Sequence, residues 1–80
     1  MLKEKVLSYT AFFEPATEGG YIVYIPALPG LVTQGESLEE AKKMVIDAIQ
    51  SYIAVMKEDG DEIPVESKDV IVDRVEAKIL

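Results

Sequence analysis

The sequence predicts a small α+β domain with the element order β-β-β-α-β, in which one long helix packs on a small, mostly antiparallel sheet. Three observations predict this class. Apolar and polar residues alternate near the N-terminus, prolines and glycines then separate further short β-prone runs, and a single helical pattern precedes a last alternating segment. A chain of 80 residues is long enough for one domain, so residues 1–80 are expected to fold as one unit.

The first strand is predicted from Lys5 to Glu14. Its odd positions are apolar and the positions between them are mostly polar, which indicates a strand with one face on a core. Phe12 breaks this alternation and is expected on the outer face, where a loop or another subunit can cover it. Pro15 and the Gly19-Gly20 pair then favour a turn, so a hairpin is the simplest connection.

The second strand is predicted over Tyr21–Ile25 and the third over Leu31–Gln34. The second is apolar on both faces, which is typical of a strand inside a sheet, and Tyr24 is expected on the outer face with Phe12. The residues that punctuate these strands are interpreted as shaping the fold: Pro26, Leu28, Pro29, Gly30 and Gly35.

A helix of about 20 residues is predicted to begin after Ser37 and to end before Gly60. The Ser37-x-x-Glu40 spacing is that of a capping box, and Glu39 and Glu40 lie in the first turn, where the helix dipole favours carboxylates. The apolar arc of this helix spans roughly 200°, wider than the stripe of about 100° that one sheet face requires. The helix is therefore expected to pack on a second surface as well.

The last strand is predicted from Asp69 to Leu80. Apolar residues at Val75, Ala77 and Ile79 alternate with charged ones, as at the edge of a sheet. A right-handed helical crossover would place this strand beside the first and parallel to it.

The composition limits the functions that the chain can have. Eight basic and fifteen acidic residues give a net charge of −7, which opposes direct nucleic-acid binding and favours encounter with a basic protein. With no His and no Cys the commonest catalytic base, nucleophile and metal ligands are missing, so no enzymatic activity, metal or cofactor is predicted. The sequence shows neither a membrane-spanning run nor a secretory signal, and a cytoplasmic location is expected.

Several short motifs, in matching order, resemble those of the HicB antitoxin family. The resemblance covers roughly residues 5–79. The motifs are Phe13-Glu14-Pro15 with Gly19-Gly20-Tyr21; Ile25-Pro26 and Leu28-Pro29-Gly30 with Thr33-Gln34-Gly35, Ser37 and Glu39-Glu40-Ala41; and Asp59-Gly60 with Ile63-Pro64.

The resemblance implies a partly degenerate ribonuclease H-like fold that binds and inhibits a small, basic, RNA-cleaving toxin of the HicA type. Many members of the family append a C-terminal DNA-binding domain. Because this sequence stops at Leu80, we expect a single HicB-like domain without that addition. The small core and wide apolar arc also predict a homo-oligomer, either a dimer or a tetramer.

The residues predicted to contact a basic partner are Glu39, Glu40 and Asp47 on the helix and Phe12 and Tyr24 on the sheet. Two other functions remain open from the sequence. One is a vestigial nuclease that uses a divalent metal held by carboxylates such as Glu14, Glu39 and Asp73. The other is a self-assembling domain that has no toxin partner.

Overall fold

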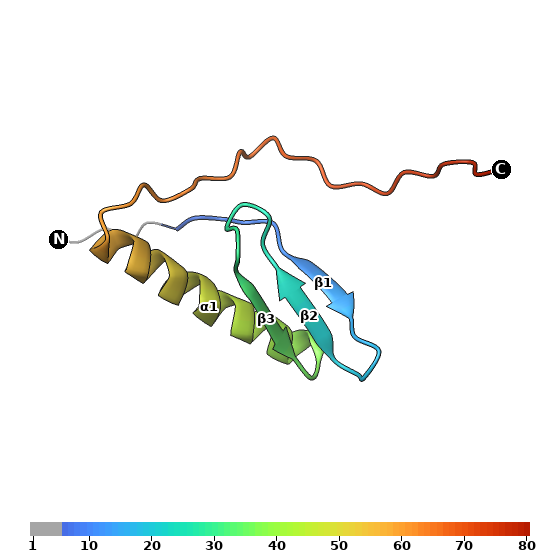
Figure 1. Ribbon diagram of the computed structural model, residues 1–80, viewed down its shortest axis with the longest axis horizontal. Helices are drawn as coiled ribbons and strands as arrows, with labels where there is room; N and C mark the ends of the chain where they lie inside the picture. The colour runs from blue at the N-terminus through green and yellow to red at the C-terminus, as the bar shows by residue number, and fades with distance from the viewer. Residues whose placement is uncertain (1–5) are drawn as a thin grey trace.

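Three strands and one helix make up the body of the molecule. The computed structural model describes residues 6–80. Strands β1 (Phe12–Pro15), β2 (Tyr21–Tyr24) and β3 (Val32–Gly35) form an antiparallel sheet in the order β1-β2-β3. Helix α1 (Leu38–Glu58) lies on one face of this sheet (Figure 1). The predicted α+β class, a small antiparallel sheet packed on one long helix, is therefore confirmed.

A glycine-rich turn joins β1 to β2. The N–H of Gly19 donates to the carbonyl of Ala16, and the N–H of Ala16 donates to the carbonyl of Gly20, both at 3.0 Å. Gly19 and Gly20 have φ angles of 101° and 74°, in the left-handed region that glycine adopts without a steric penalty. The hairpin predicted from the Gly-Gly pair is confirmed.

The strand register separates an inner face from an outer face. Phe13 pairs with Val23, which in turn pairs with Thr33, and this row faces the helix. Side chains of successive residues point to opposite faces, so Phe12 and Tyr24 lie on the outer face, as predicted. The buried core between the inner face and α1 consists of Val23, Ile25, Leu28, Leu31, Ala41 and Val45.

The loop between β2 and β3 closes one end of this core. Two successive turns hold it, because the N–H of Leu28 donates to Ile25 at 3.0 Å and the N–H of Leu31 donates to Leu28 at 3.1 Å. The side chain of Leu28 is fully buried, and the φ of 85° at Gly30 lets the chain reverse after Pro29. The hydroxyl of Tyr52 on α1 donates to the carbonyl of Pro29 at 3.0 Å, which ties the loop to the helix.

Both ends of α1 carry the caps that the sequence predicts. Ser37 is the N-cap, and its hydroxyl accepts a hydrogen bond from the N–H of Glu40 at 3.0 Å. The Glu40 carboxylate returns a bond to the N–H of Glu36, one residue before the cap, rather than to the N–H of Ser37. At the other end Gly60 has a φ of 73°, and the N–H groups of Gly60 and Asp61 donate to carbonyls of the last turn, as in a Schellman motif.

The end of β3 touches the start of α1 without any side chain between them. A Cβ atom placed on Gly35 would lie 2.5 Å from the backbone nitrogen of Ala41 and 2.6 Å from its Cα. Non-bonded atoms do not approach that closely, so the two backbones can meet only because residue 35 is a glycine. Ala41 is fully buried at this contact.

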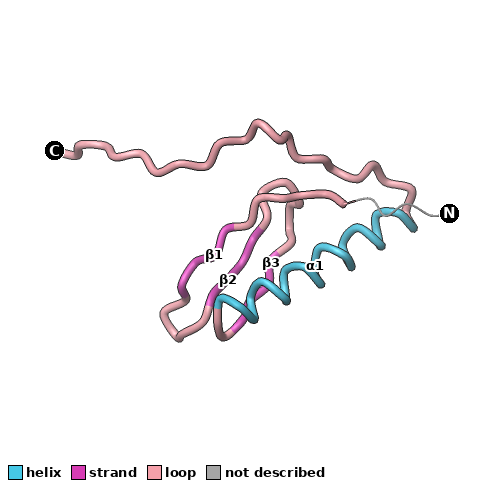
Figure 2. Tube along the Cα trace, turned by 180° about the vertical axis from the view of Figure 1, so that it is seen from behind, coloured by secondary structure: helices cyan, strands magenta, loops and turns pink. Residues whose placement is uncertain are grey.

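Two strand predictions need correction. The first strand is shorter than expected: residues 6–11 form no ladder, although Tyr9 and Ala11 still pack against the core, and Lys5 lies outside the described residues. The predicted strand from Asp69 to Leu80 is wrong for this chain, since residues 61–80 have no ladder partners and contain a turn at residues 68–69 (Figures 1 and 2). Alternation favours extended backbone, but a strand also requires a neighbouring strand, and β1 spans only four residues.

The extended C-terminal segment touches the body near the start of β1. The hydroxyl of Tyr9 donates to the carbonyl of Pro64 at 2.6 Å, and the N–H of Thr10 donates to the carboxylate of Glu66. Beyond this anchor, residues 70–73 still border a small cavity with Thr10, Phe12 and Pro26, and the end of the segment then extends past the sheet (Figures 1 and 2). The radius of gyration is consequently 15.3 Å, compared with about 12 Å for a compact chain of this length.

Substituting Gly35 with alanine should destabilise the protein by about 2–3 kcal/mol, because the added methyl group overlaps backbone atoms that cannot move independently. Urea unfolding followed by circular dichroism measures the change. Gly60→Asn is the matched control: that position faces open space and asparagine tolerates a positive φ, so the loss should stay below about 1 kcal/mol. Equal losses for the two variants would contradict the steric explanation.

The anchor at Tyr9 should weaken at high pH. Burial, and secondly the Glu66 carboxylate, raise the pKa of Tyr9 above its ordinary value near 10. Since the folded protein holds this proton more tightly than the unfolded chain, the contribution of Tyr9 to stability is complete below pH 10 and is lost as the pH rises through the raised pKa. In a titration of tyrosinate absorbance, the component that Tyr9→Phe removes should titrate above pH 10, and Glu66→Gln should move that component to lower pH. Loss of a component that titrates below pH 10 in Tyr9→Phe would refute the assignment.

Candidate interaction surfaces

An apolar row crosses the outer face of the sheet. Phe12 on β1 is opposite Tyr24 on β2, and Tyr24 is opposite Val32 on β3. The rings of Phe12 and Tyr24 stack with their centroids 5.3 Å apart and an interplanar angle of 24°. Tyr24 remains 36% exposed and Val32 65% exposed, so these two side chains are open to a partner, whereas Phe12 is half-buried beside a small cavity that residues 70–73 also line. We call these three residues the outer row.

Two polar side chains and one isoleucine border the outer row on one side. The next register row on the same face contains Glu14, Ile22 and Gln34, all of them exposed. An aromatic centre with a polar and acidic border is the usual anatomy of a protein-binding surface, in which tyrosine is enriched at the centre.

The start of α1 forms an acidic surface on the helix side of the molecule. Glu36, Glu39 and Glu40 are all exposed here, next to the positive end of the helix dipole. Glu39 lies 3.9 Å from the ammonium of Lys43, but both side chains are largely exposed, so this ion pair contributes little to stability. The three carboxylates therefore stay accessible to a cationic side chain.

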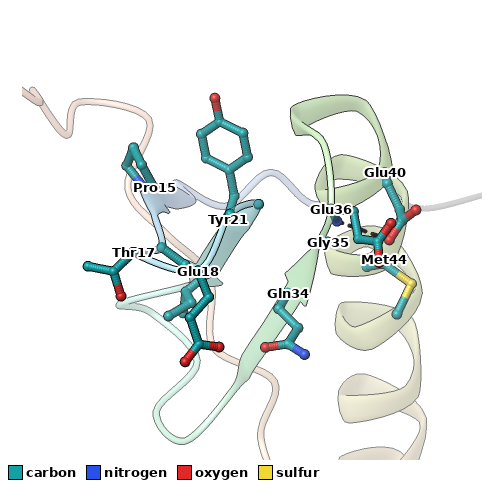
Figure 3. Close-up of a pocket in the computed structure, with 13 residues that line it drawn as sticks. Pro15, Thr17, Glu18, Tyr21, Gln34, Gly35, Glu36, Glu40 and Met44 are labelled. Atoms are coloured by element: carbon teal, nitrogen blue, oxygen red, sulfur yellow. Dashed lines mark hydrogen bonds between the residues drawn. The ribbon is translucent and has the colours of Figure 1, made fainter.

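A broad hollow lies between the β1–β2 turn and the start of α1. Its cavity volume is about 1020 Å³, and it is open to solvent on one side. Figure 3 shows Glu18 on the turn side of the hollow and Glu36 and Glu40 on the helix side, with Gln34 on β3 between them. Three carboxylates and one amide make this hollow suited to lysine or arginine side chains rather than to an anion.

The structure divides the five predicted contact residues between two places. Phe12 and Tyr24 lie together in the outer row, on the face that α1 does not cover. Glu40 lines the hollow. Glu39 does not line it and lies next to Lys43 instead. Asp47 is exposed two turns further along the helix, about 10 Å beyond Glu40, and does not line the hollow.

Sequence reasoning missed three residues of these surfaces. Val32 completes the outer row, and Glu18 and Glu36 complete the acidic border of the hollow. The strand alternation of Val32 with Thr33 could have placed Val32 on the outer face. No local pattern could have joined Glu18 to the helix start, because their proximity depends on the pairing of β2 with β3.

The carboxylates considered for a metal-dependent nuclease lie on separate elements. Glu14 is on β1, Glu39 is in the first turn of α1, and Asp73 is in the extended C-terminal segment. Within residues 6–80 no three His, Cys, Asp or Glu residues are grouped closely enough to hold a metal ion. In the same part of the chain, no helix has the length and apolar character needed to cross a membrane.

Fold and surfaces together define a class: small two-layer α+β domains with one helix on one sheet face and an open opposite face. Comparison with known proteins narrows this class to one family. A family described as the HicB-like antitoxin of bacterial toxin-antitoxin systems matches residues 9–78. Antitoxin HicB 1 of Photorhabdus laumondii is 40% identical over 60 residues, which cover 75% of this chain and 39% of that protein. Antitoxin HicB of Escherichia coli K12 is 36% identical over 61 residues, covering 76% of this chain and 44% of that protein.

A relative of similar length is also known. A UPF0150 protein of Thermoplasma acidophilum is 35% identical over 65 residues, which are 81% of this chain and 94% of that protein. The chain thus spans less than half the length of the two HicB antitoxins and nearly all of the UPF0150 protein. It belongs to the HicB-like antitoxin family, as the motifs in its sequence indicate.

Proposed function

We propose that this chain is an antitoxin that binds a small, basic, RNA-cleaving toxin of the HicA type and blocks it by covering its surface, without catalysing a reaction. Membership of the HicB-like antitoxin family supports a toxin partner in general. The observation that carries the proposal is the outer row, in which Tyr24 is stacked on the half-buried Phe12 and stays exposed, together with Val32, on the sheet face that α1 does not cover.

The outer row supplies the affinity in this proposal. Aromatic side chains bury a large area at a small entropy cost, and binding energy concentrates on a few such residues at the centre of an interface. The stack with Phe12 holds the Tyr24 ring in place before binding, which reduces the ordering cost further. A flat apolar row bordered by Glu14 suits a partner with an apolar patch surrounded by lysine or arginine.

The acidic residues supply the rate of association. The net charge of −7 attracts a basic protein over a distance, and the carboxylates of Glu39, Glu40 and Asp47 concentrate that field along one side of α1. The chemistry of the chain supports inhibition by masking, because it has no His or Cys and the Ser37 hydroxyl is engaged as the helix cap.

Replacing Tyr24 with alanine should weaken toxin binding about 30-fold, because it removes the ring at the centre of the outer row. The probe is a purified HicA-type toxin, and titration calorimetry measures the affinity. Tyr24→Phe keeps the ring and should bind within about twofold of the parent protein.

The control is Ile46→Ala on α1, an apolar side chain that is 57% exposed and distant from the outer row in the fold. This variant should bind the toxin normally. If Ile46→Ala weakens binding and Tyr24→Ala does not, the helix rather than the sheet is the toxin-binding surface.

Neutralising Glu39, Glu40 and Asp47 together, with glutamine or asparagine at each position, should slow association about tenfold at low salt and leave the dissociation rate nearly unchanged. Stopped-flow mixing measures both rates. Glu40→Gln retains an oxygen that can accept the N–H of Glu36, so the cap geometry is preserved.

The matched control neutralises Asp59, Asp61 and Glu62 beyond the helix C-terminus, which removes the same three charges. Its association rate should fall much less. Equal effects of the two triple variants would mean that net charge alone, and not the helix start, guides the toxin.

A further inference from the structure

Phe12 is more deeply covered than its position in the sheet explains. Strand β1 is at the edge of the sheet, so Phe12 has a neighbour within the outer row on one side only, which is Tyr24. Tyr24 lies on the central strand, between Phe12 and Val32, and is nevertheless exposed, whereas Phe12 is half-buried. Part of the cover on Phe12 therefore comes from outside the sheet.

The chain that follows α1 supplies this cover. It returns past the start of β1, and residues 70–73 line a cavity of about 350 Å³ that Thr10 and Phe12 also line (Figures 1 and 2). The fit is loose, because Val70 remains 50% exposed and Val72 58% exposed. These residues form no ladder with β1, so they lack the backbone hydrogen bonds that would fix a strand in this place.

Two hydrogen bonds anchor the returning chain upstream of the cavity. The hydroxyl of Tyr9 donates to the carbonyl of Pro64, and the N–H of Thr10 donates to the carboxylate of Glu66. Thr10 precedes β1, so its N–H is satisfied by this carboxylate and not by the ladder. We call these two bonds the anchor.

A turn connects the anchor to the covering residues. The hydroxyl of Ser67 accepts a hydrogen bond from the N–H of Asp69 at 3.1 Å, and the carbonyl of Ser67 accepts one from the N–H of Val70 at 3.4 Å. The turn redirects the chain between the anchor and the cavity, so that residues 70–73 reach Phe12. Anchor, turn and cover therefore follow one another within ten residues.

We propose that residues 64–73 form a strap that covers Phe12 while the anchor is closed and uncovers the whole outer row when the anchor opens. This regulation rests on the proposed function, because it concerns access to the same surface. A toxin that packs on the Phe12 ring must displace residues 70–73, so toxin and strap compete. The apparent affinity is then reduced in proportion to the fraction of molecules in which the strap is open.

The contacts that hold the strap are weak enough to be broken separately from the fold. Each of the two hydrogen bonds of the anchor typically shifts an equilibrium by about two- to tenfold. Opening breaks no strand pairing, and none of the six buried core residues belongs to the strap. The sheet and α1 therefore stay in place when the strap opens.

A nitroxide label at Val75→Cys tests whether the strap is closed. The chain has no cysteine of its own, and Val75 is 89% exposed and only two residues beyond the cavity. The label should strongly broaden the amide NMR signals of Thr10 and Phe12. The double variant Tyr9→Phe/Glu66→Ala removes the anchor and should lose about half of this broadening. Broadening that is absent with the anchor intact, or unchanged without it, would overturn the strap.

The control for this measurement places the label on a separate copy of the chain. Labelled protein without isotope enrichment is mixed with enriched protein that carries no label, and the amides of Thr10 and Phe12 should then stay sharp. Equal broadening by a label on the separate copy would mean that the covering segment comes from another molecule. That result would overturn a strap that covers its own chain.

Toxin affinity tests the competition. Titration calorimetry with a purified HicA-type toxin should give about threefold tighter binding for Tyr9→Phe and for Glu66→Ala, and about tenfold for the double variant. Loss of a carboxylate alone would weaken the attraction to a basic protein, so tighter binding identifies release of the strap. Glu62→Ala is the matched control: it removes the same charge at an exposed position outside the anchor and should bind no tighter than the parent protein.

Failure of the strap and failure of the proposed function give different results. If Tyr24→Ala weakens toxin binding but the anchor variants bind like the parent protein, the proposed function stands and the strap does not control the outer row. If neither the parent protein nor any variant binds the toxin, the proposed function and the competition both fail, whereas the label at Val75→Cys still shows whether residues 70–73 close over Phe12.

Discussion

The close approach of β3 and α1 at Gly35 and Ala41 is the constraint on which the rest of this fold depends. The chain leaves the sheet and enters the helix within a few residues, so the helix can return over the inner face only if the two backbones meet. The absence of a side chain at Gly35 permits that contact, and the cap at Ser37 fixes the direction of the helix that follows. Val45 then packs in the same buried cluster as Val23 and Leu28.

A core built on one side of the sheet leaves the other side available. The six buried residues all lie between the sheet and the helix, and the outer row contributes no buried side chain. The helix itself is not fully covered, since Met44, Ile46 and Val55 remain exposed on its flanks, in agreement with its wide apolar arc. A domain of this size buries only part of its apolar surface, and here apolar side chains stay exposed both on the outer sheet face and on the flanks of α1.

Local sequence signals predicted where the helix, its caps and most turns lie, but not which distant segments pair or come close together. The cap at Ser37, the reversal at Gly60 and the outward position of Phe12 each follow from a few adjacent residues, and the structure has all three. Residues 69–80 have an equally clear alternation, yet they form no strand, because strand pairing depends on how far β1 extends and not on these residues alone. The hollow between Glu18 and Glu40 could likewise not be predicted from local sequence, since its two sides are brought together only by the register of the sheet.

The length of α1 also determines where the chain turns back toward the sheet. Its 21 residues span about 32 Å from the acidic start to the reversal at Gly60, after which the Tyr9–Pro64 bond returns the chain to the sheet. One additional turn would move that reversal by about 5.4 Å and would carry Pro64 out of reach of Tyr9. Single-residue insertions would also rotate the exit by about 100°. In a domain with such a small core, the length of α1 therefore sets the geometry between its surfaces, and loops such as the β1–β2 turn are the places where length can vary.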